Sequence, residues 1–238
     1  TASQINSALS SCSEGVVYLN PGTYNLTAGV DFGGGAAGVT LRGAGADQTL
    51  LVFSGDAGCN GARASVCMHS SDTNWKGGPS NTANWTAGYA RRATTITLSS
   101  VSNLRVGNPL ILDQLDDTND DGSIVVAAST SAGTKSGTGV GGPYSLEDNG
   151  GGNQRYGRQQ QQIVTVTGCG SVTTTGASCS GSNVTVTISP GLYMPNWSSS
   201  KTPQAWWPTD PSLRVGVEHL SIDSSKNSSS DAGIELFN

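Results

Sequence analysis

Four short β-prone clusters recur at nearly constant spacing near the start of the chain, within residues 15–53. The first and third clusters begin 22 residues apart, the second and fourth begin 21 residues apart, and turn residues separate them all. The clusters are residues 17–19, 30–32, 39–41 and 51–53. A fixed repeat of this length is typical of stacked architectures, in which each unit buries its apolar face only against its neighbours. Two interleaved series predict two strands per turn of 21–22 residues, as in a coil of parallel β-helix.

The same stretch resembles the opening of a known superfamily. The matching segments are INSALSSC, GVVYLNPGTY, GVTLRGAG and TLLVF. Together they are similar to the N-terminal region of the pectate-lyase-like right-handed parallel β-helix superfamily, which includes polysaccharide lyases, polygalacturonase-type hydrolases and phage tailspikes. The resemblance covers residues 4–53 and resumes at 213–238. It implies an all-β fold and a polysaccharide as the ligand class, although a fold alone does not fix function.

The rest of the chain divides into segments of different pattern. Residues 2–11 place Ile5, Ala8 and Leu9 at helical spacing, so we expect a short N-terminal helix that caps the first coil. Regular alternation at residues 163–167 and 184–188 is typical of half-buried antiparallel strands. The predicted organisation is a cap and first β-helix coils at 1–58, a long loop at 59–92, an inserted antiparallel β-subdomain at 93–192, and a return loop with resumed, incomplete coils at 193–238.

Few coils fit this interpretation. About two precede the insertion and fewer than about two follow it, whereas the catalytic members of the resembled superfamily generally have many more. An uncovered coil would expose apolar side chains and unpaired strand edges. We therefore expect either that these 238 residues are the N-terminal part of a longer protein, or that a second copy covers the open end.

The composition is that of an extracellular all-β protein. Charged residues make up 12% of the sequence and glycine accounts for 33 of 238 residues, a balance typical of secreted proteins with many turns. A net charge of −5 argues against nucleic acid as a partner. It also disfavours polyanionic glycans, unless a cation or a local basic cleft intervenes. No apolar run is long enough for a membrane-spanning helix.

Cysteines and glycosylation sequons fit a secreted location. The predicted disulfides are Cys59–Cys67 and Cys169–Cys179, which leave Cys12 as an unpaired thiol. A metal site formed by the first cysteine pair with His69 is the alternative, although a fourth ligand is missing. Asn-x-Ser/Thr triplets arise readily by chance in a chain rich in serine and threonine, so they are candidate glycosylation sites only. They lie at Asn25, Asn84, Asn183, Asn196 and Asn227.

An acidic segment matches part of a calcium-binding loop. Asp117, Asn119 and Asp121 alternate along the chain ahead of Gly122, a pattern that lets oxygen ligands converge on a hard cation. The match ends at Ala128, where a bidentate glutamate belongs. A solvated acidic turn is the alternative interpretation. Ca²⁺ is the one cofactor that the sequence indicates.

Acidic residues that follow the apolar run at 110–112 are candidates for catalysis. Asp113 and Asp116 could supply the carboxylate pair of a glycoside hydrolase or the base of a polysaccharide lyase. Arg155 and Arg158 would then stabilise the developing negative charge. The alternative is a solubilising surface cluster. The characteristic motifs of polygalacturonases and the arginine-rich stretch of pectate lyases are absent, so it stays open whether the chain is an enzyme.

The histidines of the sequence are His69 and His219. His219 shares one face of a predicted strand with Ser221 and Asp223, so a Ser–His–Asp arrangement is geometrically possible. An outward polar stripe is the simpler interpretation.

Tryptophans concentrate in segments predicted to be loops. Amphipathic aromatic rings stack on sugar faces, and exposed rings often mark binding sites. The candidates for substrate binding are Trp75, Trp197, Trp206 and Trp207. The last two could equally fill the junction between the β-helix and the inserted subdomain.

These observations predict a secreted, carbohydrate-active β-helix protein that binds or cleaves a polysaccharide, as a lyase or a glycoside hydrolase. The alternative is a non-catalytic structural or adhesive protein that self-associates through its open end, as a homo-oligomer, filament or surface layer. Neither a nucleic-acid partner nor a membrane span is expected.

Overall fold

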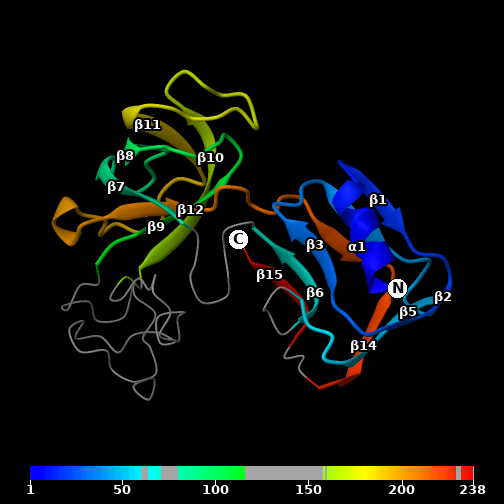
Figure 1. Cartoon of the computed structure of the whole chain (residues 1–238). Coiled ribbons are helices and arrows are strands. Elements are labelled where there is room, and N and C mark those ends of the chain that lie inside the picture. The colour runs from blue at the N-terminus through cyan, green and yellow to red at the C-terminus, as the bar shows by residue number, and fades with distance from the viewer. Residues whose placement is uncertain (60–63, 71–79, 116–157, 159, 229–231, 238) are drawn as a thin grey trace, which may run out of the picture. The chain divides into compact units, whose positions relative to one another are not determined.

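The computed structural model describes residues 1–59, 64–70, 80–115, 158, 160–228 and 232–237 (Figure 1). The chain forms two compact units. The first consists of residues 1–75 and 210–238, and the second, residues 76–209, is inserted into it. Apart from one helix and a short 3₁₀ turn at Ser199–Lys201, the regular structure of the described residues is β-strand.

The first unit is a parallel β-helix. Its described strands are β1 (Gly15–Tyr18), β2 (Gly22–Leu26), β3 (Val30–Gly34), β4 (Val39–Arg42), β5 (Thr49–Gly55), β6 (Ala64–His69), β13 (Gly216–Glu218), β14 (Ser221–Asn227) and β15 (Ala232–Phe237). They form three parallel sheets, in the orders β1-β4-β13, β2-β5-β14 and β3-β6-β15. Each sheet takes one strand from each successive turn of chain, which is the connectivity of stacked coils. A right-handed coil stays our prediction, since nearly all crossovers between parallel strands have that hand.

Each coil contains three strands rather than the two predicted from the spacing. Val30 pairs with Val66 and Leu51 pairs with Tyr24, so the second and fourth sequence clusters belong to different sheets. Their separation of 21 residues is therefore coincidental. The strand that the pattern missed is β2, with the sequence GTYNL, in which only Leu26 is fully buried. A strand with one buried side chain gives little apolar signal.

Apolar columns run through the interior of the coils. In the second coil, Leu41, Leu51 and Val66 are fully buried, because neighbouring coils cover them on both sides. Ile234 stacks on Val66 in register but is 46% exposed, and Leu236 in the same strand is 57% exposed. The described part of the chain therefore leaves the interior of the third coil open on one side.

Helix α1 (Ala2–Ser11) covers the other end of the β-helix, as predicted (Figure 1). It begins with a capping box between Thr1 and Gln4 and buries Ile5 and Leu9 against the coil core. Asn6 accepts a hydrogen bond from Asp31 N at 3.0 Å and donates one to Gly29 O at 3.2 Å. Its side-chain amide thus takes the place of a neighbouring strand at the edge of β3.

The second unit is a closed antiparallel barrel. Its strands are β7 (Asn81–Ala87), β8 (Thr95–Ser100), β9 (Pro109–Asp113), β10 (Gln161–Cys169), β11 (Ser182–Ser189) and β12 (Gln204–Trp207), arranged in the order β10-β11-β8-β7-β12-β9. The alternating residues of β10 bury every second side chain, as the sequence pattern predicted. Large side chains fill the interior, and Trp85, Leu98 and Trp207 are each at most 2% exposed.

The barrel extends beyond the range 93–192 that the sequence indicated. That range holds β8 to β11, whereas β7 and β12 come from segments predicted to be loops. These two strands pair with each other and close the ring. In β7 and β12 the apolar positions are alanine and tryptophan rather than Val or Ile, which hid their strand character. Strand β6 likewise lies within the predicted loop at 59–92.

Both predicted disulfides are present, Cys59–Cys67 in the β-helix and Cys169–Cys179 in the barrel. Cys12 is a half-buried free thiol. Because the first disulfide occupies both sulfur atoms, the alternative metal site of that pair with His69 is wrong. Among the described residues, no helix is long and apolar enough to cross a membrane.

The sequons differ in how their side chains are placed. Asn25, Asn84 and Asn183 are exposed. Asn196 instead donates to Gln160 Oε1 at 2.8 Å. Asn227 bonds the backbone of residue 57 in both directions. A glycan on either of these last two would break a hydrogen bond, so glycosylation stays a prediction that suits the first three.

Candidate functional site

The outward side chains of β1, β4 and β13 form one solvent-facing surface of the β-helix. Inward positions in these strands hold Val17, Leu41 and Val217, which are in register, so the alternate positions point outwards. The surface, called the outer face below, consists of Val16, Tyr18, Thr40, Arg42, Gly216 and Glu218. Because all three strands belong to a hydrogen-bonded sheet, the spacing of these side chains is fixed by the backbone.

An aromatic ring lies at the first-coil end of this surface. Tyr18 is 54% exposed and its neighbour on the same face, Val16, is 48% exposed. Val16 and Tyr18 thus place two exposed apolar side chains on one side of β1. Tyr18 is in register with Arg42, one strand away at a spacing of about 4.8 Å.

Arg42 and Glu218 form an ion pair across the next two strands. Arg42 Nε donates to Glu218 Oε1 at 2.6 Å, and Arg42 Nη2 lies 2.5 Å from the same oxygen. The side chains are 45% and 38% exposed, so water screens the pair and it contributes at most about 1 kcal/mol to stability. Arg42 Nη1 and Glu218 Oε2 have no hydrogen-bond partner within the described part of the chain.

A second ion pair lies at the start of the same strands. Arg214 Nη2 donates to Glu14 Oε1 at 2.9 Å, and both side chains are more than 70% exposed. The two pairs together carry no formal net charge. The outer face therefore combines the exposed ring of Tyr18, the small residues Thr40 and Gly216, and an arginine whose charge is neutralised by a glutamate.

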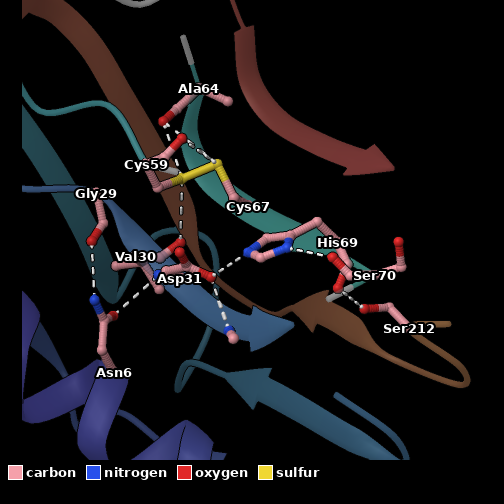
Figure 2. A network of polar contacts seen from close by, with 11 residues as sticks. Asn6, Gly29, Val30, Asp31, Cys59, Ala64, Cys67, His69, Ser70 and Ser212 are labelled. Atoms are coloured by element: carbon pink, nitrogen blue, oxygen red, sulfur yellow. Dashed lines mark hydrogen bonds and ion pairs between the residues drawn. A yellow bond between two sulfur atoms is a disulfide. The ribbon is translucent and has the colours of Figure 1, made fainter. Parts of the chain in front are cut away.

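His69 and Asp31 form a polar network on the sheet that contains β3 and β6, as Figure 2 shows. Asp31 Oδ1 accepts from Gly33 N at 2.8 Å and lies 3.1 Å from His69 Nε2. His69 Nδ1 lies 2.8 Å from Ser70 O, and Ser212 Oγ donates to the His69 carbonyl at 2.6 Å. Both ring nitrogens are engaged, so the ring offers no free nitrogen to a substrate. The network joins β3, β6 and the segment before β13.

The predicted Ser–His–Asp alternative does not assemble. His219 is exposed, with a left-handed backbone φ of 54°. Ser221 Oγ donates to Ala46 O, and Asp223 accepts from Ser225 N at 2.9 Å. The serine and the aspartate thus bond to nearby backbone groups rather than to the histidine.

The two described members of the predicted catalytic set form a buried ion pair at the end of β9, on the side of the strand opposite the core residues Leu110 and Leu112. Arg158 Nη1 donates to Asp113 Oδ1 at 2.7 Å, and the carboxylate side chain is 0% exposed. Arg158 Nη2 also donates to Thr202 O at 2.7 Å. This arrangement ties the end of β9 to the segment before β12. A carboxylate that is both buried and ion-paired is poorly placed to remove a proton from a polysaccharide.

Several predicted site residues lie outside the described residues. They are the catalytic candidates Asp116 and Arg155, the metal candidates Asp117, Asn119 and Asp121, and the substrate-binding candidate Trp75. The calcium site therefore stays a prediction. Among the described residues, no group of three or more acidic, histidine or cysteine side chains could hold a metal ion.

The other tryptophans predicted to bind substrate are buried, and two of them, Trp197 and Trp207, belong to the barrel core. Trp197, Trp206 and Trp207 are 5%, 7% and 1% exposed. Trp197 packs on Trp85 with ring centroids 5.1 Å apart. Rings buried in this way present no face to a sugar in this conformation.

Tyr18, Arg42 and Glu218 were not among the residues singled out from the sequence. A local signal exists, because each directly follows an inward apolar residue at the end of its strand, in GVVY, VTLR and GVE. Aligning the three strands requires knowledge that residues 176 positions apart are neighbours. The sequence of the inserted barrel separates β13 from β1 and β4, so the alignment cannot be seen in the sequence.

Comparisons with known proteins give a likeness of fold. No protein-family model and no curated protein matches the chain. Among solved structures, the chain is similar to the tailspike gp61 of Pseudomonas phage phi297, with a TM-score of 0.50 and 17% sequence identity over 98% of this chain and 28% of that one.

The chain is also similar to the gp54 tailspike of Acinetobacter baumannii bacteriophage AP22, solved with an A. baumannii capsular saccharide. The TM-score is 0.44, with 12% identity over 94% of this chain and 27% of that one, which is too low to carry a conclusion. The chain thus spans under a third of the length of either tailspike. At the level of fold, this chain resembles part of a phage tailspike.

Proposed function

We propose that this chain binds a polysaccharide through the outer face of β1, β4 and β13. The observation that carries the proposal is the exposed ring of Tyr18, held in register with the exposed Arg42–Glu218 pair. Aromatic rings pack on the apolar faces of sugars, while arginine and glutamate exchange hydrogen bonds with hydroxyl groups. The hydrogen-bonded sheet holds the strands that carry these groups in place before a ligand arrives, which reduces the entropy lost on binding.

Two further findings support a polysaccharide as the ligand class. The sequence resembles a superfamily of polysaccharide lyases, hydrolases and tailspikes, and the fold resembles part of a phage tailspike. We propose binding rather than cleavage, because Asp113 and Arg158 are committed to a buried ion pair. The disulfides support an extracellular location, since such bonds persist in oxidising compartments.

Affinity electrophoresis in gels that contain single polysaccharides tests the proposal. We expect at least one polysaccharide to retard the wild-type chain, and Tyr18→Ala to weaken that interaction about tenfold, or 1.4 kcal/mol. Tyr193→Ala is the matched control, because Tyr193 is 63% exposed but lies on the barrel. Equal retardation of Tyr18→Ala and wild type would contradict the proposed site.

Self-association is a second candidate function, supported by the exposure of Ile234 and Leu236 among the described residues. The outer side of α1 carries Ser3, Gln4 and Ser7, so its polar surface does not complement Ile234 and Leu236 of another copy. A second copy would therefore join tail to tail, with the two third coils facing each other. Light scattering should then show a dimer that Leu236→Asp dissociates. A monomer at high concentration would exclude this candidate.

A further inference from the structure

We infer that the polysaccharide recognised by the outer face is neutral and carries vicinal hydroxyl groups, which the Arg42–Glu218 pair binds as a joint donor and acceptor. The inference rests on the proposed function and adds the chemical class of the ligand. It follows from which atoms of the ion pair are used and which remain available.

The ion pair is one-sided. Both contacts from Arg42 reach the same oxygen, Glu218 Oε1, at 2.6 and 2.5 Å. The Nη1 donors of the guanidinium and the second carboxylate oxygen, Oε2, meet no hydrogen-bonding group in the described ranges. One exposed pair thus keeps a donor group on Arg42 and an acceptor oxygen on Glu218 available to a ligand.

Adjacent sugar hydroxyls fit this arrangement chemically. Each hydroxyl has one proton to donate and lone pairs to accept with. One hydroxyl donates to Glu218 Oε2, and its neighbour accepts from Arg42 Nη1. Both hydrogen bonds involve a charged group, which makes them stronger than bonds between neutral partners. Tyr18, one strand away from Arg42, supplies the apolar contact for the same sugar ring.

An acidic glycan fits the same atoms poorly. A uronate carboxylate would have to displace Glu218 from Arg42 and then lie close to the displaced carboxylate, and like charges at that distance repel. The Glu14–Arg214 pair at the other end of the strands offers no uncompensated positive charge either. The whole chain carries a net charge of −5, so its long-range field also opposes a polyanion.

The test compares neutral and acidic polymers at low and high salt. Affinity electrophoresis would use dextran, galactan and mannan as neutral polymers, and alginate and polygalacturonate as uronate polymers. We expect wild type to bind a neutral polymer and to bind it nearly as well at high salt, because no ion pair forms with the ligand. Preference for a uronate polymer, lost at high salt, would overturn the inference.

Two variants make the test specific. Glu218→Gln keeps the shape of the side chain but removes its charge, so neutral binding should weaken about fivefold to tenfold, while the released Arg42 gains uronate binding. Glu14→Gln breaks a more exposed pair outside the outer face, with side chains 71% and 72% exposed, and should leave binding of the neutral polymer unchanged. Unchanged ligand preference in Glu218→Gln would contradict the inference. Melting temperatures of both variants should match wild type, since exposed pairs contribute little to stability.

The outcomes separate this inference from the proposed function. If no polymer retards the wild-type chain, the proposed function fails and the inference fails with it. If Tyr18→Ala abolishes binding to a polymer that proves to be a uronate, the site stands and only the ligand class is wrong.

Discussion

The two units of this protein differ in whether the edge strands of their sheets are paired. The barrel closes its six strands into a ring, so its sheet has no free edge. In the described part of the β-helix, α1 covers the first coil, whereas Ile234 and Leu236 of the third coil are about half exposed. A side chain in the barrel is therefore buried by closure, whereas a side chain in the β-helix is buried only as far as its neighbouring coils cover it.

This difference predicts where the molecule is sensitive to change. In the barrel, one substitution anywhere in the core should affect the whole ring. In the β-helix, the same substitution should cost less toward the third coil. The outer face lies on strands from all three coils of the β-helix. Its geometry therefore depends on the unit in which stability varies from coil to coil.

The largest effect is expected for the buried ion pair of the barrel. Arg158→Ala removes the ion pair with Asp113 while the carboxylate stays buried, so we expect a loss of about 3–5 kcal/mol in the free energy of unfolding. Urea denaturation measures this loss. The double variant Arg158→Met with Asp113→Leu should recover most of it, since apolar replacements of similar volume are often neutral. An Arg158→Ala variant as stable as wild type would show that the pair does not stabilise the barrel.

Substitutions along one column of the β-helix compare its covered and open coils directly. Val66→Ala removes two methyl groups from a fully buried site and should cost about 2 kcal/mol. Ile234→Ala, at the position paired with Val66, should cost under about 1 kcal/mol, because that side chain is already 46% exposed. Both are measured by chemical denaturation. Equal costs would mean that another surface covers the third coil in solution.

At the covered end of the β-helix, the side-chain amide of Asn6 makes two hydrogen bonds to the backbone at the edge of β3. Asn6→Ala removes both hydrogen bonds to the edge of β3 and should cost about 1–2 kcal/mol, less than a core substitution in the covered coil. Hydrogen exchange should report faster exchange at the Asp31 amide in particular. Ser7→Ala, on the exposed side of the same helix, is the control and should leave that amide protected.

The smallest effect concerns acid sensitivity at the third coil. Hydrogen bonds from the side chain and backbone of Ser225, helped by Lys226, lower the pKa of Asp223 below its ordinary value. A depressed pKa stabilises the fold above the ordinary aspartate range, and this contribution is lost as the pH falls through the folded-state value. Asp223→Asn should therefore slightly flatten the fall in melting temperature on acidification. An unchanged profile would show that the aspartate makes no such contribution.

The sequence predicted the elements that carry strong local patterns. The helix at Ile5 and Leu9, the strands around Leu41 and Phe53, and the alternating strand β10 were all found. Each shows its periodicity within a few residues. The weakly apolar β2 and the tryptophan-containing β7 and β12 were missed because their burial depends on partners distant in sequence.

The residues of the candidate site could not be grouped from the sequence for a related reason. Tyr18, Arg42 and Glu218 become neighbours only through the register of three coils, and the barrel separates the last of them from the other two. The tryptophans drew attention as rare, amphipathic residues. Trp197 and Trp207 are buried in the barrel core, which no local pattern revealed.

The way the chain enters and leaves the barrel has a consequence for folding and for evolution. Asn81, at the start of β7, pairs with Trp207, at the end of β12, and Asn81 Nδ2 donates to Trp207 O at 3.1 Å. A folded barrel thus holds the start of β7 and the end of β12 side by side. An unfolded insertion would instead add a long loop whose closure opposes pairing of the third coil. The barrel should fold before the third coil docks, and other domains with adjacent ends could replace it without disturbing the coils.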